Sequence, residues 1–367
     1  MEKWIPMINE DLDIYVDENN GSIIFSSVKT GMNQQFELDD VFLKLIRSIN
    51  GEMPNSHLYE VIKKDFQELT KEEFIEGIGV LLEEGIIRFK NKDSQTVQLQ
   101  NERYKRLFEF FNDYSEYENP LTSLQKLSNA KVVLIGIGGG GTWVSHSLVM
   151  SGIKTLIIID DDEIELSNLN RQPLFREKDI GKKKACIAAE YLKDLNPSTE
   201  IVPVLKKVTS IEDLAFLDDD IDLIISCADF PSTKEMGLLV TRYSYPRNIP
   251  HIIGGGYNSH LGKFGTTIIP NKSACFNCCI TTKENEMIEE EKGWQLIKSH
   301  SYVNAGGSLS SLAGLVGSFL ALEATKVITN FARPHLMNKT LSYHLSQNSF
   351  LENSYKQINS CEICGEN

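Results

Sequence analysis

The chain has 367 residues, of which 41% are hydrophobic and 24% charged, and its formal net charge is −14 at pH 7. This composition is typical of a soluble globular protein with two or three domains. The excess of acidic residues argues against nucleic acid or an anionic membrane as a partner, because both favour a basic surface.

The sequence also lacks the marks of secretion and membrane insertion. No basic segment followed by an apolar stretch opens it, and no apolar run reaches the roughly 18 residues that a membrane span needs. The longest candidate, Leu309–Leu322, is rich in Ser, Gly and Ala and predicts a buried helix. Seven cysteines in a chain of this length do not suggest a disulfide scaffold. We therefore expect a cytoplasmic protein.

Residues 1–90 are predicted to form a small domain that begins with a hairpin. Leu12–Val16 and Ser22–Ser27 alternate like strands, and Asn19-Asn20-Gly21 between them is a turn signal. Three helices are expected next, opened by Asp39, by Ser56 and by the capping box of Thr70 and Glu73, followed by a strand at Ile86–Phe89. This order is the plan of a winged helix.

DNA binding is one use of that plan. The third helix (TKEEFIEGIGVLLEEG), however, carries Glu where a DNA-reading helix needs Lys or Arg. The sequence therefore favours another ligand for this domain.

Residues 91–101 are polar and predict a linker, and residues 102–367 form a larger domain. There, buried strands alternate with helices, which predicts an α/β fold: a Rossmann-like, mostly parallel sheet with helices on both faces. The expected strands are Lys131–Gly136, Lys154–Asp160, Glu200–Leu205, Asp222–Ser226 and Pro250–Ile253, with Gly262–Ile269 as an antiparallel addition.

A glycine-rich loop follows the first of these strands and precedes a helix. It reads Gly136-Ile137-Gly138-Gly139-Gly140-Gly141, and such loops bring backbone N–H groups close to phosphate. Asp160 ends the next strand, where an acidic residue can hold ribose hydroxyls. NAD is therefore one candidate ligand, and a purely structural glycine turn is another.

The residues downstream favour a triphosphate over NAD. Asn168, Arg171 and Lys184 are potential phosphate donors within a short span, more than one pyrophosphate requires. Asp229 ends a buried strand and can hold Mg²⁺ against the phosphates. The sequence therefore predicts a magnesium–ATP site at the carboxyl ends of the parallel strands.

Two C-x-x-C pairs lie far apart in the chain. Cys275 and Cys278 form the first, and Cys361 and Cys364 the second. Four thiolates in this arrangement predict a tetrahedral structural Zn²⁺ site that ties the C-terminal tail to the larger domain. A redox pair or unrelated buried cysteines are the alternatives.

Taken in order, these motifs resemble the ubiquitin-activating superfamily, and more narrowly its bacterial adenylyltransferases of the ThiF, MoeB and HesA type. The resemblance covers about residues 101–367 and implies activation of a carboxylate by adenylation. It also implies site residues. Gly136, Gly138, Gly139, Gly141, Asp160, Asp162, Asn168 and Gln172 would bind ATP; Arg171 and Lys184 would act on the phosphates, and Asp229 on Mg²⁺.

Within this superfamily the chain most resembles peptide-adenylating enzymes of the microcin C type, which carry a winged-helix-like peptide clamp. That resemblance implies a ribosomally made leader or precursor peptide as substrate, in a modified-peptide pathway. Arg103-Tyr104-Lys105-Arg106 matches an R-Y-x-R element, which implies a homodimer in which Arg106 reaches the partner's ATP. One departure is Phe230-Pro231 after Asp229, where the family commonly has Asp-Asn.

Two further expectations concern the segment Thr281–Ala305. It contains no cysteine, so no thioester step is expected, and its acidic part is expected to be a solvated loop that orders over substrate. Three functions stay open: a peptide adenylyltransferase, an activator of a sulfur-carrier C-terminus, and a non-catalytic leader-peptide-binding partner of a YcaO-type cyclodehydratase. Retention of all the phosphate donors favours an enzyme.

Overall fold

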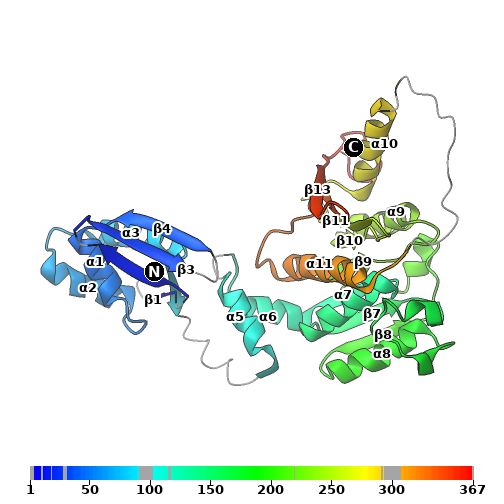
Figure 1. Ribbon diagram of the computed structural model, residues 1–367, viewed down its shortest axis with the longest axis horizontal. Coiled ribbons are helices and arrows are strands. Elements are labelled where there is room, and N and C mark those ends of the chain that lie inside the picture. Colours follow the sequence, from blue (N-terminus) through cyan, green and yellow to red (C-terminus); the bar gives the residue numbers. More distant parts are fainter. Residues whose placement is uncertain are drawn as a thin grey trace. The chain divides into compact units, whose positions relative to one another are not determined.

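The computed structural model describes residues 4–9, 11–17, 19–27, 31–90, 102–114, 117–218, 220–290, 292 and 307–365. The chain divides into two compact units, Met1–Lys105 and Arg106–Asn367 (Figure 1). The expected linker, residues 91–101, lies outside the described residues.

The smaller unit contains two antiparallel sheets. One pairs β1 (Ile5–Ile8) with β5 (Ile87–Lys90), and the other has the order β2 (Asp13–Asp17), β3 (Ser22–Ser27), β4 (Met32–Glu37). The hairpin of β2 and β3 was predicted, whereas β1 and β4 were not, because IPMI and MNQQFE do not alternate apolar and polar residues. As a result, β3 is a central strand, and the exposed edges of its sheet are β2 and β4.

Three helices pack on these strands: α1 (Asp40–Ser48), α2 (Asn55–Asp65) and α3 (Lys71–Glu83). The Asp39 side chain caps α1, and the capping box of Thr70 and Glu73 is formed at α3, both as predicted. Ser56 does not cap α2, which begins one residue earlier, after Pro54. The unit has its own core, which includes Phe25, Leu45, Leu58, Ile78 and Leu81.

The larger unit is built on an eight-stranded sheet with the order β13-β12-β11-β10-β9-β6-β7-β8. The strands from β10 to β8 are parallel, and β11, β12 and β13 continue the sheet antiparallel, so the predicted mostly parallel sheet is confirmed. The bounds are β6 Lys131–Ile135, β7 Thr155–Ile159, β8 Glu200–Val204, β9 Leu223–Ser226, β10 His251–Ile253, β11 Leu261–Ile268, β12 Lys339–His344 and β13 Ser349–Ser354.

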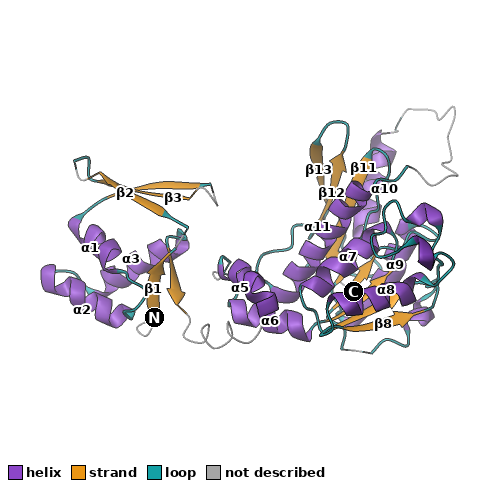
Figure 2. Cartoon of the chain, turned by 60° about the horizontal axis from the view of Figure 1, so that its bottom comes forward, coloured by secondary structure: helices purple, strands orange, loops and turns teal. Residues whose placement is uncertain are grey.

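Helices cover both faces of this sheet, as Figure 2 shows. Alternate residues of the strands point to opposite faces: Val132 and Leu134 of β6 pack with α7, α8 and α11, and Val133 and Ile135 pack with α9 and α10. The helices are α5 Lys105–Asn112, α6 Pro120–Asn129, α7 Gly139–Met150, α8 Lys184–Leu195, α9 Thr233–Ser244, α10 Phe276–Glu290 and α11 Ser310–Thr329, with short 3₁₀ turns at Glu102–Tyr104, Leu166–Asn168, Glu177–Asp179, Ile211–Leu214 and Tyr245–Arg247.

Two expectations for the C-terminal half need correction. The acidic stretch up to Glu290, expected as a loop, is the second part of helix α10; residues 291 and 293–305 of that segment lie outside the described residues. The predicted buried helix at Leu309–Leu322 is present as α11, but Leu315 and Leu322 stay 39% and 41% exposed. Among the described helices, α11 alone is long and apolar enough to cross a membrane, and half of its apolar stretch is buried inside the protein.

Candidate active site

A cavity of about 730 Å³ opens at the carboxyl ends of the parallel strands of the larger unit. Ligands of open α/β sheets bind in this position, because the loops that follow the strands converge there. The described residues that line it include nearly all of the predicted site: Gly136, Gly138, Gly139, Asp160, Asp162, Asn168, Arg171, Gln172, Lys184 and Asp229.

The glycine loop is shaped by close contacts that exclude side chains. Gly136 has a φ of +90°, and a Cβ there would lie 2.8 Å from the backbone N of Ala228. A Cβ on Gly141 would lie 2.1 Å from the Gly136 carbonyl oxygen, so Gly141 closes the turn from behind and does not line the cavity. No side chain caps helix α7 at Gly138, which leaves the N-terminal N–H groups of a 12-residue helix for an anion.

Asp160 joins the glycine loop to the segment that follows β7. One carboxylate oxygen accepts a hydrogen bond from Ile137 N at 2.8 Å, and the other accepts one from Asp162 N at 2.9 Å. Burial raises the pKa of Asp160, and the bond from Ile137 opposes that rise. Asp160 therefore fixes the position of the loop in addition to facing the cavity.

The predicted phosphate donors are brought together on the β7 side of the cavity. Lys184 Nζ pairs with Asp162 Oδ2 at 2.7 Å, and Arg171 Nη1 donates to the Ser167 carbonyl at 2.7 Å. Asn168 and Gln172 are buried in the same wall. A bound triphosphate would face both cations and the glycine loop.

On the other side of the loop, Asp229 follows β9 and faces the cavity together with its neighbour Phe230. The Phe230 ring is 54% exposed and lies under Lys207, whose Nζ is 3.5 Å from the ring centroid. Because Lys207 follows β8, this cation–π contact passes over the ends of β6 and β7. Phe230, where the sequence departs from the family pattern, therefore forms part of one wall of the cavity.

Several lining residues were missed by sequence reasoning, namely Lys206, Lys207, Tyr257, Asn258 and Lys263. Lys206 and Lys207 directly follow a predicted strand, so their position at its carboxyl end was a usable signal. The Tyr257 hydroxyl packs against Gly139, since a Cβ there would lie 1.8 Å from it, and nothing in the sequence indicates this contact. Arg106 lies exposed on α5 and does not line the cavity.

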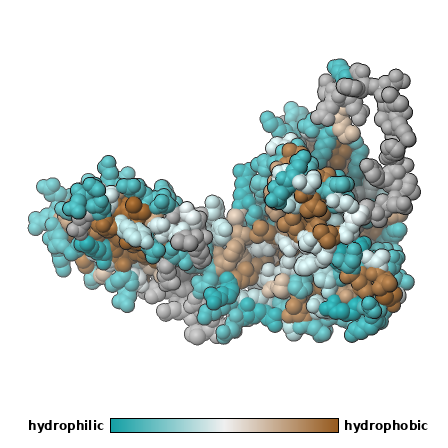
Figure 3. Space-filling view, in the orientation of Figure 1, coloured by the Kyte–Doolittle hydropathy of each residue, from teal (hydrophilic) through white to brown (hydrophobic). Residues whose placement is uncertain are grey.

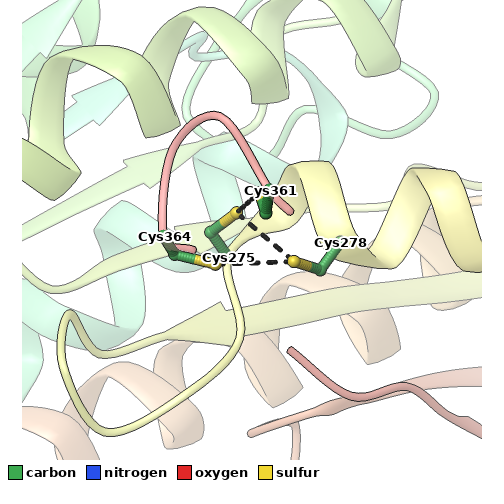
Figure 4. A group of neighbouring side chains, drawn as sticks. All are labelled: Cys275, Cys278, Cys361 and Cys364. Carbon is green, nitrogen blue, oxygen red and sulfur yellow. Dashed lines mark hydrogen bonds between the residues drawn. The ribbon is translucent and has the colours of Figure 1, made fainter. Parts of the chain in front are cut away.

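The two C-x-x-C pairs meet in space, as predicted (Figure 4). Cys275 and Cys278 stand at the start of α10, Cys361 and Cys364 lie in the tail after β13, and all four sulfurs are within 4.8 Å of one another. Neighbouring sulfurs are 3.4–3.9 Å apart. A tetrahedron with Zn–S bonds of about 2.3 Å has sulfurs roughly 3.8 Å apart, so the cluster could hold a metal ion.

Burial raises the pKa of the Cys275 and Cys278 thiols. Thiolates in such a site need a cation to hold them. Two groups already donate to the sulfurs: Asn277 Nδ2 to Cys361 at 3.5 Å and Ile358 N to Cys278 at 3.4 Å. Hydrogen bonds of this kind to the ligand atoms orient the ligands of metal sites.

Comparison with known proteins places this site in a family context. Residues 110–363 match the ThiF family. The chain is 27% identical over 242 residues to the vegetative HesA protein of Trichormus variabilis, covering 66% of this chain and 83% of HesA. It is 26% identical over 246 residues to the sulfur carrier protein ThiS adenylyltransferase of Escherichia coli, covering 67% of this chain and 90% of that protein.

Among solved structures, E. coli MccB has a TM-score of 0.76 at 22% identity, covering 99% of this chain and 97% of MccB. MccB has also been solved with ATP, and as the microcin C7 biosynthetic enzyme in complex with N-formylated MccA. At this identity the likeness shows a shared fold over both units of the chain.

Proposed function

The chain belongs to the ThiF family and is an adenylyltransferase, and we propose that it transfers AMP from ATP to the carboxylate of a ribosomally made peptide. The observation that carries the proposal is the cavity. It gathers a glycine loop, an acidic residue after β7, two cations and a carboxylate after β9 at one edge of the sheet. Its relatives include a ThiS adenylyltransferase, and MccB, which shares the fold, has been solved with ATP.

In the proposed reaction, a carboxylate oxygen of the peptide attacks the α-phosphorus of ATP. The bond from that phosphorus to the bridging oxygen breaks, and pyrophosphate leaves with the electron pair. Arg171 and Lys184 stabilise the charge on the phosphates, and the glycine loop holds them in place. Asp229 would hold Mg²⁺, which neutralises charge on the triphosphate when bound.

Lys184 must change partner for this role. In the structure it pairs with Asp162, and only 9% of its side chain is exposed, whereas the Asp162 side chain is 65% exposed. A phosphate oxygen entering beside the glycine loop would replace Asp162 as its partner. The lysine is therefore already fixed at the wall where the phosphates are proposed to bind.

The smaller unit supports a peptide as the substrate. Its helix-and-sheet plan fits a winged-helix peptide clamp, and both β2 and β4 offer a strand edge to an extended peptide. Tyr15 and Val16 of β2 are exposed apolar side chains at such an edge. MccB, which resembles the chain over this unit as well, has been solved with a peptide.

One observation favours a second candidate, adenylation of a sulfur-carrier C-terminus. The ThiS adenylyltransferase is named for a sulfur carrier protein and matches 67% of the chain. It does not account for the smaller unit. The two functions therefore differ in whether residues 1–90 are needed.

We further propose a structural Zn²⁺ at the four cysteines and a cytoplasmic homodimer. Apolar side chains of Leu315 and Leu322 on α11 and of Phe350 on β13 remain exposed on the same side of the sheet, and Figure 3 shows brown patches on the larger unit. Such a face fits association with a second copy. A homodimer would also account for Arg106, which does not reach the cavity of its own chain.

The test is transfer of AMP from α-³²P-labelled ATP to synthetic peptides encoded beside the gene, with a sulfur-carrier protein assayed in parallel. Labelling of the peptide, and of the peptide alone, is expected. Labelling of only the sulfur carrier would replace the peptide by the second candidate.

A further inference from the structure

Five cationic side chains of described residues line the active-site cavity, and four of them already have a partner. Lys184 pairs with Asp162 at 2.7 Å and Lys206 with Asp213 at 3.2 Å. The other two contacts are Arg171 with the Ser167 carbonyl at 2.7 Å and Lys207 with the Phe230 ring. The fifth is Lys263, whose Nζ forms no ion pair or hydrogen bond with any described residue.

Lys263 also stands apart from the other cations in the fold. It lies in β11, and the sheet order β11-β10-β9-β6-β7-β8 puts it on the opposite side of the glycine-loop strand from Arg171, Lys184 and the β8 lysines. The phosphate donors are therefore on the β7 side, and Lys263 is the one described cation of the opposite wall.

The backbone around Lys263 is built to hold it past the end of β10. Its N–H donates to the Gly256 carbonyl at 2.9 Å, and a Cβ on Gly255 would lie 2.6 Å from the Lys263 Cβ, so only glycine fits beside it. The pairing of β11 with β12 is irregular between Lys263 and Gly265. Gly265 has a φ of +81°, and a Cβ there would lie 1.8 Å from the Ile253 carbonyl oxygen. Such irregularities re-aim side chains beside active sites.

We propose that Lys263 binds the carboxylate of the incoming substrate, which rests on the adenylyl transfer proposed above. In a displacement at phosphorus, the attacking and leaving oxygens lie roughly in line. The phosphate donors on the β7 side mark where pyrophosphate leaves, so the attacking carboxylate comes from the β10–β11 side. The free cation there, Lys263, matches the charge of that nucleophile.

This assignment predicts which kinetic constant depends on Lys263. In the loose transition state of phosphoryl transfer the attacking carboxylate keeps most of its charge, so Lys263 stabilises the bound substrate and the transition state to about the same extent. Loss of the cation should therefore raise KM and leave kcat nearly unchanged. ATP affinity should not change, because Lys263 lies away from the phosphate donors.

The experiment measures pyrophosphate release by the full-length protein with ATP and Mg²⁺. The substrate is a pool of the synthetic peptides encoded beside the gene, with free C-termini, and the same pool with C-terminal carboxamides serves as a competitive inhibitor. The variants are Lys263→Gln, Lys263→Arg and, as a matched control, Lys272→Gln, which removes an exposed lysine outside the cavity. Thermal melting and affinity for a non-hydrolysable ATP analogue check that each variant folds and binds nucleotide.

Lys263→Gln should raise the apparent KM for the free-acid pool about 10-fold or more, with kcat within about 3-fold of the wild type. Its inhibition constant for the carboxamide pool should stay at the wild-type value, and Lys263→Arg should recover most of the lost affinity. An unchanged KM, an equal loss of affinity for acids and carboxamides, or weakened nucleotide binding would each overturn the role of Lys263. None of these results would overturn the proposed peptide function. If the wild type releases no pyrophosphate with the free-acid pool, the proposed peptide function fails, and this inference fails with it.

Discussion

Lys184 and Asp162 are joined twice, through a 2.7 Å contact between Nζ and Oδ2 and through a 3.0 Å hydrogen bond from Lys184 N to the Asp162 carbonyl. The second bond fixes the start of helix α8 to the segment after β7. The first holds the ammonium group at the cavity wall. The same residue therefore anchors a helix and presents a charge, and these two roles can be separated by mutation.

Lys184→Met should remove the charge and keep the backbone bond. We expect ATP–pyrophosphate exchange to fall about 10²–10³-fold, the range for loss of one group that stabilises transition-state charge. The melting temperature should change little, because a partly exposed ion pair contributes about 0–1 kcal/mol. Exchange assays and calorimetric melting measure the two effects. A large loss of stability with normal exchange would show that Lys184 acts only in the fold.

Asp229→Asn should suppress the same exchange reaction about 100-fold or more and raise the Mg²⁺ concentration needed for half-maximal activity. The reason is that an amide is a weaker magnesium ligand than a carboxylate. Asp222→Asn is a matched control, because Asp222 lies just before the opposite end of β9 and accepts a hydrogen bond from Lys131 N. Titration of Mg²⁺ at fixed ATP gives the comparison. Equal magnesium dependence in both variants would remove Asp229 from the metal site.

Arg106 gives a test of shared active sites. We expect Arg106→Ala and Asp229→Ala to be inactive alone, and mixed dimers to recover part of the activity because one site in each has both residues. Differently tagged subunits, purified as heterodimers, are assayed for exchange. Heterodimers of two differently tagged Asp229→Ala subunits are the control. Heterodimers as inactive as this control would contradict the assignment of Arg106 to the partner's site.

The central parallel strands and the cavity could be predicted from the sequence because both depend on local signals. Buried runs such as Val132–Ile135 predict strands by their apolar continuity, and parallel strands bring their carboxyl ends to one edge of the sheet. Residues at those ends, such as Asp160 and Asp229, could therefore be placed in one cavity. The glycine loop was recognisable because close contacts at Gly136, Gly139 and Gly141 admit no side chain.

The elements that escaped prediction depend on partners far away in the chain. β1 forms because Ile5–Ile8 pairs with Ile87–Lys90, and its own residues carry no strand pattern. The acidic stretch before Glu290 continues helix α10, which starts beside the cysteine cluster. Lys263 lines the cavity beside an irregularity in the pairing of β11 with β12, and Tyr257 lines it in contact with Gly139. These relationships are tertiary, so no local pattern encodes them.

Cys364→Ser should release the C-terminal tail from the larger unit. We expect bound zinc, measured by mass spectrometry of the purified protein, to fall well below one per chain, with a lower melting temperature. Structural Zn²⁺ in small peptides is worth roughly 10–16 kcal/mol of apparent binding energy, so the loss should be large. Cys186→Ser, which changes a cysteine outside the cluster, should keep zinc and stability. Full zinc in Cys364→Ser would exclude the four-cysteine site.

Deletion of residues 1–90 separates the peptide function from the sulfur-carrier alternative. The smaller unit has its own core, and the described part of the active-site cavity lies entirely within the larger unit, so ATP binding should survive the deletion. Peptide affinity should fall strongly, because the strand edges at β2 and β4 are lost. Calorimetric titration of ATP and of the pathway peptide into both proteins gives the two affinities, and gel filtration checks that the oligomer is retained.

A less drastic variant, Tyr15→Asp on β2, should weaken peptide binding and leave ATP affinity unchanged, since Tyr15 is exposed and outside the core. If the shortened protein binds and adenylates the peptide as well as the full chain does, the smaller unit is not a peptide clamp, and the C-terminus of a sulfur carrier becomes the better-supported substrate.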